Sequence, residues 1–301
     1  MRIPGDKIAR ILAVEVPAIE PRLRHVLCAD PTGLHRVGYA EWGDPDNPRV
    51  LLCVHGLTRT GRDFDTLAQR LSDRYRVVCP DMPGRGRSDW LRNPNLYAVP
   101  QYVADCVTLV ARTGAEAVDW VGTSMGGLIG MTLASLPDSP IRRLVLNDIG
   151  PVLEPGGLQR IGGYVGASEP FATREQGLAR LRELAAGFGP HTDAQWAELN
   201  RHYLVERDGR WTYHYDPAIA TPFRGTTGAP APAMWPLWDA IACPVLALRG
   251  EQSDLLSRET LREMAGRGPR AAVVEVVGVG HAPTLMTDAQ IEPVRAFLQQ
   301  P

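Results

Sequence analysis

The stretch that decides the fold is Val118-Asp119-Trp120-Val121-Gly122-Thr123-Ser124-Met125-Gly126-Gly127. An apolar strand pattern runs into Gly-x-Ser-x-Gly, and the apolar segment 128–136 that follows has helical spacing. A serine on such a tight strand-to-helix turn projects its hydroxyl from the edge of a sheet, and the glycines avoid clashes that a Cβ would cause. The helix N-terminus behind Ser124 offers free backbone N–H groups to an oxyanion. The stretch therefore predicts a nucleophilic serine.

Strand and helix patterns alternate on both sides of this turn. Short apolar runs at 50–54, 76–80, 144–146, 245–248 and 272–277 are typical of strands, and the continuous run at 50–54 suits a strand buried on both faces of a parallel sheet. Segments with helical spacing separate most of these runs. We therefore predict an α/β protein with a doubly wound, mostly parallel sheet.

The alternation is interrupted between residues 150 and 238, where glycine and proline are frequent. We predict that 150–238 forms a mainly helical cap inserted after the sixth strand, and that 22–149 and 239–301 together form the core. Residues 1–21 are predicted to be an N-terminal extension. Their apolar run is too short and too interrupted for a signal peptide. No segment has the length needed to span a membrane.

Composition and charge exclude several classes of partner. The 301 residues carry a net charge of −2, and their arginines are scattered, which argues against a nucleic-acid partner and a membrane surface. The five cysteines are widely spaced with no Cys-x-x-Cys, which favours reduced thiols in a cytoplasmic protein and gives no zinc motif. We expect no metal and no organic cofactor, and the sequence does not indicate an oligomeric state.

The proton acceptor for the serine is predicted to be His281. It lies in a Gly-flanked loop after the last strand pattern, where the chemistry of parallel sheets gathers. A carboxylate must orient this imidazole, and Asp254, a short loop beyond 245–248, is the favoured candidate. Asp148, directly after 144–146, is the alternative acid, and Glu251 is a weaker one. The order serine, acid, histidine along the chain is that of the nucleophile-elbow hydrolases.

The oxyanion formed by attack of Ser124 also needs donors. His55-Gly56 ends the strand at 50–54, and the backbone N–H of Leu57 is expected to face that of Met125 across the oxyanion. His55 itself is expected to be structural. We predict no metal at this site.

With these residues, the chain resembles the α/β-hydrolase superfamily over about 23–298. The stretch Asp81-Met82-Pro83-Gly84-Arg85-Gly86-Arg87-Ser88 is similar to that family's D-x-x-G-x-G-x-S loop, and Gly-x-Ser-Met-Gly-Gly is common in its carboxylesterase and lactone-hydrolase branch. The resemblance implies the α/β-hydrolase fold with an eight-stranded sheet. It also implies Ser124 as nucleophile, Asp254 as acid, His281 as base, and Leu57 and Met125 as oxyanion donors.

The predicted activity is cleavage of a small-molecule ester or lactone through an acyl-enzyme. Arg59, Trp235 and Trp238 are candidate substrate-binding residues, and Tyr164, Phe171 and Trp196 are further aromatic candidates. Alternatives are C–C bond hydrolysis or cofactor-free perhydrolysis (haloperoxidase activity) on the same triad, and a non-enzymatic ligand-binding protein. C–C hydrolases commonly carry tryptophan after the histidine, whereas this chain has Ala282.

Overall fold

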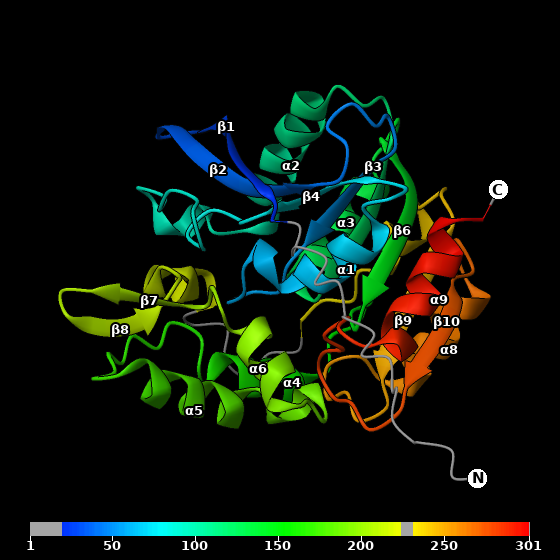
Figure 1. Cartoon of the computed structure of the whole chain (residues 1–301). Coiled ribbons are helices and arrows are strands. Elements are labelled where there is room, and N and C mark those ends of the chain that lie inside the picture. Colours follow the sequence, from blue (N-terminus) through cyan, green and yellow to red (C-terminus); the bar gives the residue numbers. More distant parts are fainter. Residues whose placement is uncertain (1–19, 224–230, 301) are drawn as a thin grey trace, which may run out of the picture.

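The fold is built around a sheet of eight strands, β1 (Arg22–Asp30), β2 (Gly33–Trp42), β3 (Val50–Val54), β4 (Arg76–Pro80), β5 (Val118–Thr123), β6 (Ile141–Asn147), β9 (Val245–Gly250) and β10 (Ala272–Val276). It is seen in a computed structural model that describes residues 20–223 and 231–300. The strand order is β1-β2-β4-β3-β5-β6-β9-β10 (Figure 1).

Strand directions confirm the predicted fold class. β1 and β2 pair antiparallel, as do β2 and β4, and every other neighbouring pair in this sheet is parallel. β3 lies between β4 and β5, so the chain leaves it first toward one edge of the sheet and later toward the other. Loops that follow strands at such a reversal point diverge and leave room for a ligand. The loops after β3 and β5 carry His55 and Ser124.

Helices cover both faces of the sheet, as the strand patterns require. Val50, Leu52 and Val54 of β3 belong to one core cluster, and Leu51 and Cys53 belong to the other. Successive side chains of a strand point to opposite faces, so both faces are apolar and both must be covered. The first cluster includes side chains of α2 (Val99–Thr113), α3 (Met125–Ala134) and α8 (Arg258–Gly266), and the second includes side chains of α1 (Asp65–Leu71) and α9 (Asp288–Leu298).

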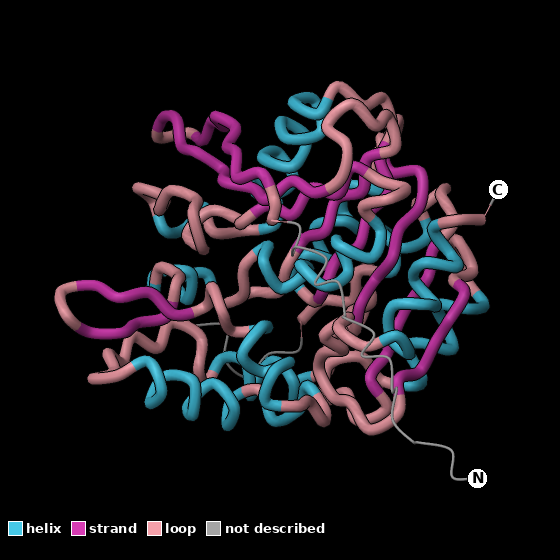
Figure 2. The backbone as a smooth tube through the Cα atoms, in the orientation of Figure 1, coloured by secondary structure: helices cyan, strands magenta, loops and turns pink. Residues whose placement is uncertain are grey.

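Most of the described part of the segment between β6 and β9 lies together beside one end of the sheet, at the lower left of Figure 2. This part contains α4 (Pro155–Gly162), α5 (Arg174–Leu184), α6 (Asp193–Leu199), β7 (Leu204–Arg207) and β8 (Arg210–Tyr213). The last helix before β9, α7 (Trp235–Asp239), packs against α3 instead. The antiparallel hairpin β7–β8 adds to the helices expected from the sequence. Asp208 and Gly209 form its turn with φ of 51° and 72°, as a two-residue hairpin turn with both central residues at positive φ requires. Short 3₁₀ helices are η1 (Gly61–Phe64), η2 (Pro94–Leu96), η3 (Ala186–Phe188) and η4 (Pro217–Phe223).

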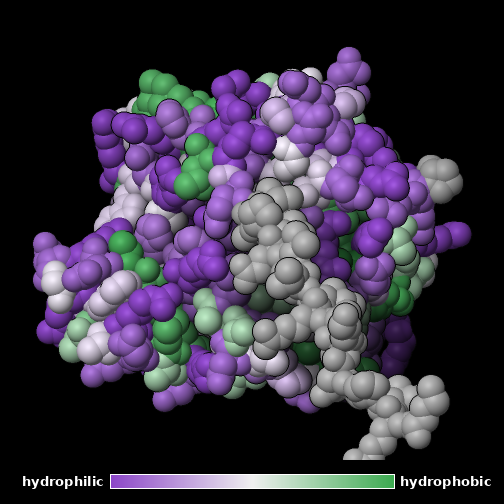
Figure 3. Space-filling model, in the orientation of Figure 1, coloured by the Kyte–Doolittle hydropathy of each residue, from purple (hydrophilic) through white to green (hydrophobic). Residues whose placement is uncertain are grey.

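Two features of the surface and termini complete the fold. Outside the grey segment, the face shown in Figure 3 is mostly hydrophilic, with hydrophobic residues in small separate groups. Within residues 20–223 and 231–300, the structure holds no helix long and apolar enough to cross a membrane. The predicted N-terminal extension falls almost entirely in 1–19, outside the described residues.

Candidate active site

Ser124 sits on the strained turn that the sequence predicts. It links β5 to α3 with φ of 51° and ψ of −116°, a left-handed backbone conformation uncommon for residues other than glycine. A Cβ at Gly126 would overlap the carbonyl oxygen of Val54, and a Cβ at Gly122 would overlap that of Gly126. The two glycines therefore let α3 approach β3 and β5 closely enough to present the serine at the end of the sheet.

Gly126→Ala is expected to lower the free energy of unfolding by at least about 3 kcal/mol, because neither the β3 backbone nor α3 can move aside. Urea unfolding of the purified variant measures this loss. Gly156→Ala in α4 is the matched control, since a Cβ there would meet no described atom within 4 Å. A helix favours alanine over glycine by about 1 kcal/mol, so the control should be at least as stable as the parent protein. Equal stability of both variants would contradict the close approach at Gly126.

A continuous row of hydrogen-bonding distances joins Ser124 to His281 and Asp148. Ser124 Oγ lies 2.9 Å from Nε2 of His281, and Nδ1 of the same ring lies 2.7 Å from Oδ2 of Asp148. Asp148 is fully buried and accepts further hydrogen bonds from Gly250 N at 2.7 Å and Ser253 Oγ at 2.6 Å. The three side chains come from loops that follow β5, β10 and β6, so the carboxyl ends of these strands gather them at one edge.

The assignment of Asp254 as the acid is wrong for this geometry. Asp254 is half-exposed and forms a two-pronged ion pair with Arg160, at 2.6 Å from Nε and 2.8 Å from Nη2. Its neighbour Ser253 points inward instead and donates to Asp148. Glu251 accepts a hydrogen bond from Gly278 N at 2.8 Å, so its carboxylate holds the loop after β10 and does not contact the imidazole of His281. Asp148, the alternative acid, takes the position beside His281.

His55 is a structural histidine, as expected. It is fully buried, its Nδ1 lies 2.7 Å from Gly56 O, and its Nε2 accepts from Met82 N at 2.9 Å. Burial lowers the pKa of this imidazole to about 3, so it is neutral and uses one nitrogen as donor and the other as acceptor. These two contacts fix the start of the loop that carries Leu57.

The Asp81–Ser88 stretch also holds the loop that carries Leu57 in place. The sequence did not indicate this role. Arg85 is fully buried and donates from Nε to Leu57 O at 2.8 Å and from Nη1 to Tyr102 Oη at 2.7 Å. Its Nη2 lies 3.6 Å from Met125 Sδ. One guanidinium thus contacts both residues whose N–H groups were predicted to bind the oxyanion.

A cavity opens over Ser124 and His281 between the sheet and the 150–238 segment. The segment contributes mainly apolar side chains, namely Ile161, Tyr164, Phe188 and Leu199. The sheet side contributes the loop after β3 and residues beside His281. Of the further aromatic candidates, Tyr164 lies in this lining, whereas Phe171 packs edge-on against Tyr213 of the hairpin.

Trp235 and Trp238 were predicted to bind substrate, and the structure places both elsewhere. Trp238 is fully buried in the core, and its indole N–H donates to Arg267 O at 3.0 Å. Trp235 lies under the Arg267 guanidinium, 4.6 Å from it. Neither is among the described residues that line the cavity over Ser124. Both tryptophans instead pack α7 against the sheet domain.

Arg59 does line the cavity, but its charge is already paired. Nε and Nη2 donate to the two carboxylate oxygens of Asp63 at 2.7 and 2.8 Å. Nη1 donates to Asn200 Oδ1 at 3.0 Å, and Nη2 also donates to Leu199 O at 2.8 Å. The guanidinium stacks 4.2 Å over the ring of Tyr203. Arg59 therefore joins the loop after β3 to the segment beyond α6, and little of its charge remains for a substrate.

The fold and the site agree with the comparison with known families. Residues 51–295 match the model of the alpha/beta hydrolase family, and this chain belongs to that family. The predicted class of enzyme, a carboxylic ester hydrolase, is confirmed by its relatives.

Three proteins of this family are similar to the chain over nearly its whole length. A 3-hydroxybutyrate-oligomer hydrolase from Cupriavidus necator is 57% identical over 279 residues, which cover 90% of this chain and 95% of that protein. The crystal structure of an alpha/beta hydrolase from Novosphingobium aromaticivorans is 41% identical with a TM-score of 0.83, covering 93% and 98%. A putative hydrolase from Rickettsia typhi is 30% identical with a TM-score of 0.86, covering 93% and 99%.

Proposed function

We propose that Ser124, His281 and Asp148 form the catalytic triad of a serine esterase that acts on short oligoesters of a hydroxy acid. The observation that carries the proposal is the hydrogen-bonded row from Ser124 Oγ through the imidazole to Asp148. A serine hydroxyl is a weak nucleophile unless a base removes its proton, and His281 Nε2 is within reach to do so. Asp148 holds the ring with Nδ1 protonated and stabilises the imidazolium that forms.

The reaction then takes two halves. Ser124 Oγ attacks the ester carbonyl as His281 Nε2 takes its proton, and the tetrahedral intermediate collapses to an acyl-enzyme as the same nitrogen returns a proton to the leaving alcohol. Water then attacks the acyl-enzyme by the same route and releases the acid. Each half moves one proton through His281, so the triad is restored after each turnover.

The oxyanion is assigned to the backbone N–H groups of Leu57 and Met125. Met125 is the first residue of α3, where unsatisfied N–H groups and the helix dipole favour negative charge. Leu57 lines the same cavity as Ser124, and Arg85 and His55 hold its loop in place. Both donors are backbone groups on rigid elements, so they need no rearrangement when charge develops on the carbonyl oxygen.

Residues 150–238 serve as the cap in this proposal. Apolar side chains of its described residues cover the cavity over the triad, and such cover limits the water that would screen the oxyanion interactions. Contacts beside His281 add to those of Arg59 in fastening the cap to the core near the site. Arg160 pairs with Asp254, and Gly187 O accepts from Gly280 N, directly before His281.

The substrate class follows from the relative that acts on 3-hydroxybutyrate oligomers, since the match spans nearly all of both chains. An ester of this kind presents small apolar groups on both sides of the carbonyl, which suit Ile161, Phe188 and Leu199. The proposal extends to a small-molecule substrate in the cytoplasm, where the five free thiols are stable.

The test is hydrolysis of the linear dimer and trimer of 3-hydroxybutyrate, measured as released monomer, beside p-nitrophenyl butyrate. We expect turnover of all three and covalent labelling of Ser124 by a fluorophosphonate. The methyl ester of the trimer is the matched control for recognition of the free carboxylate, and it should be cleaved comparably because Arg59 is already paired. Cleavage of p-nitrophenyl butyrate alone would contradict the proposed oligoester substrate. Labelling of Ser124 without turnover of any ester would contradict the proposed esterase activity.

A further inference from the structure

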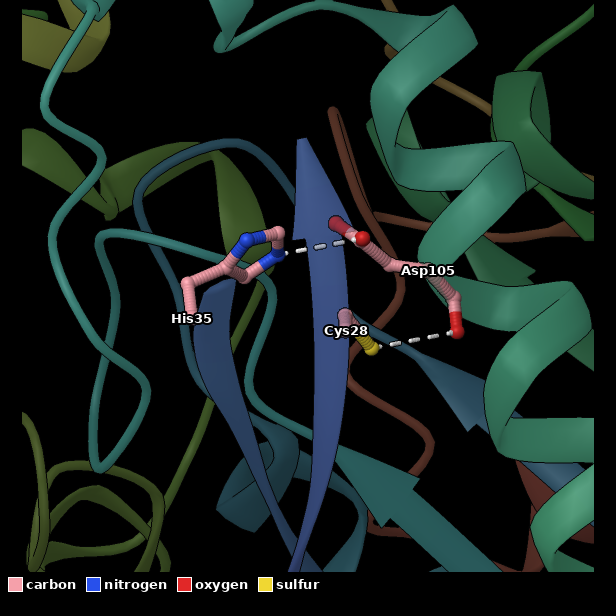
Figure 4. Close-up of side chains that lie close together, drawn as sticks. All are labelled: Cys28, His35 and Asp105. Atoms are coloured by element: carbon pink, nitrogen blue, oxygen red, sulfur yellow. Dashed lines mark hydrogen bonds and ion pairs between the residues drawn. The ribbon is translucent and has the colours of Figure 1, made fainter. Parts of the chain in front are cut away.

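A second group of chemically reactive side chains lies at the β1 edge of the sheet, whereas Ser124 follows the interior strand β5. Figure 4 shows its members, Cys28, His35 and Asp105, close together. Cys28 of β1 and His35 of β2 are paired residues of an antiparallel hairpin, so their side chains stand next to each other on one face. Asp105 reaches the same point from α2. The Cys28 Sγ, a ring nitrogen of His35 and a carboxylate oxygen of Asp105 all lie within 4.8 Å of one another.

These three side chains are buried, at 2%, 3% and 1% exposed, and they are not fully satisfied. Among the described residues, Asp105 Oδ2 has no hydrogen-bond partner. Asp105 Oδ1 accepts from Gln101 Nε2 at 2.8 Å and lies 3.1 Å from His35 Nε2. A buried carboxylate oxygen without a donor costs free energy, which a cation at this point would recover.

The donor set and its geometry suit zinc. Thiolate, imidazole and carboxylate are the ligands that zinc takes in proteins, at about 2.0 to 2.3 Å in a tetrahedral arrangement. Ligand atoms at those bond lengths are about 3.3 Å apart, close to the 3.1 Å between His35 Nε2 and Asp105 Oδ1. All three ligand atoms lie within 4.8 Å of one another, so the Cys28 sulfur approaches the other two by rotation of its side chain.

Asp30 lies behind His35, on the side of the imidazole that faces away from the proposed ion. Its Oδ2 lies 3.2 Å from His35 Nδ1, the nitrogen that the ion would not use, although the two atoms do not form a hydrogen bond in the structure. Zinc-binding histidines usually direct their second nitrogen at a carboxylate or carbonyl, which fixes the tautomer and orients the ring. Oδ1 of Asp30 is held by Thr32 N at 2.6 Å, so the carboxylate is itself positioned.

We propose that Cys28, His35 and Asp105 bind one zinc ion, with water as the fourth ligand. The ion fastens the β1–β2 hairpin at the sheet edge to α2, and so adds to hydrogen bonds such as that from Gln101 Nε2 to Ala29 O at 3.0 Å. Zinc binds the thiolate form of cysteine, so binding displaces the proton of the Cys28 thiol. The site is separate from the ester chemistry, because Ser124 follows β5, four places along the sheet from β1.

The test uses the full chain, freed of metal by a chelator and titrated with Co²⁺ and then Zn²⁺. We expect one equivalent of Co²⁺ to give the near-ultraviolet band of a cobalt–thiolate bond, and saturating Zn²⁺ to raise Tm by about 5 °C. Cys28→Ala should abolish the band. Cys243→Ala is the matched control and should retain it, since Cys243 is the one described cysteine that is not buried and is therefore the most accessible competing thiol.

Two outcomes overturn the proposal. One is no stoichiometric cobalt–thiolate band, and the other is a band that survives Cys28→Ala. A band from the active site is excluded, because no cysteine is among the described residues lining the cavity over Ser124. Asp105→Asn is a second variant that keeps the side-chain shape, and it should weaken Co²⁺ binding at least tenfold. Ester hydrolysis by metal-free Cys28→Ala should equal that of the parent, so failure of this site leaves the triad unaffected.

Discussion

Ser124→Ala is expected to lower kcat for ester hydrolysis by roughly 10⁶-fold, the loss seen when a triad loses its nucleophile. Removal of Oγ leaves His281 Nε2 with no hydroxyl to activate at 2.9 Å, and no acyl-enzyme can form. The remaining cavity and backbone donors still bind an ester, so KM should change far less than kcat. Steady-state kinetics with p-nitrophenyl butyrate measures both, and fluorophosphonate labelling should disappear.

Ser135→Ala is the matched control for this prediction. It removes a hydroxyl from the far end of α3, where Ser135 Oγ donates only to Thr132 O at 2.8 Å. Its activity should stay within twofold of the parent protein. Because alanine also tolerates the φ of 51° poorly, thermal unfolding of Ser124→Ala must show a folded protein before the kinetics are interpreted. Retention of more than a hundredth of kcat in folded Ser124→Ala would refute Ser124 as the nucleophile.

The sequence predicts the sheet and its reactive edge well because both follow from local patterns. Apolar runs such as Val50–Val54 require burial on both faces, and the glycines at 122 and 126 are needed for the elbow. Ser124 and His281 could be found because each directly follows a recognisable strand pattern. The position of a side chain at the end of a parallel strand is set by the strand itself.

The cap was harder to predict because its sequence does not show the regular alternation of strand and helix patterns that marks the core. The hairpin β7–β8 was not predicted, although Asp208-Gly209 is a strong local signal for a two-residue hairpin turn and the residues of β8 after it alternate between polar and aromatic. Trp238 illustrates the opposite error. This tryptophan was predicted to bind substrate because it lies in the inserted segment. In the structure its indole N–H donates to Arg267 O at 3.0 Å, and Gly268 leaves room for its ring.

The acid could not be chosen from the sequence, because two aspartates follow neighbouring strands of one edge. β6 and β9 are paired in parallel, so Asp148 and Asp254 both come near the same place. The loop after β9 decides between them. Buried Arg249 donates to Leu256 O at 2.7 Å and to Glu251 O at 3.0 Å, which curls the loop so that Ser253 faces inward. Asp254 is then left outside, where Arg160 of the cap neutralises it.

Asp148→Asn is accordingly expected to lower kcat by about 10⁴-fold with the fold retained. The carboxylate accepts three hydrogen bonds, from His281 Nδ1, Gly250 N and Ser253 Oγ. An asparagine amide has one oxygen and one NH₂ group, so at least one of these donors would face another donor. The imidazole then turns to the wrong tautomer and Nε2 no longer accepts the serine proton.

Asp254→Asn separates this explanation from a general effect of removing a carboxylate near His281. Asp254 forms only an exposed ion pair with Arg160, and such pairs contribute about 0 to 1 kcal/mol, so its kcat should fall less than tenfold. Far-ultraviolet circular dichroism and thermal unfolding of both variants establish that each is folded. If Asp254→Asn loses activity and Asp148→Asn keeps it, the loop after β9 must rearrange when substrate binds, and the acid would be Asp254. The structure argues for the opposite result, because Asp148 is fully buried and its carboxylate accepts hydrogen bonds from Gly250 N, Ser253 Oγ and His281 Nδ1.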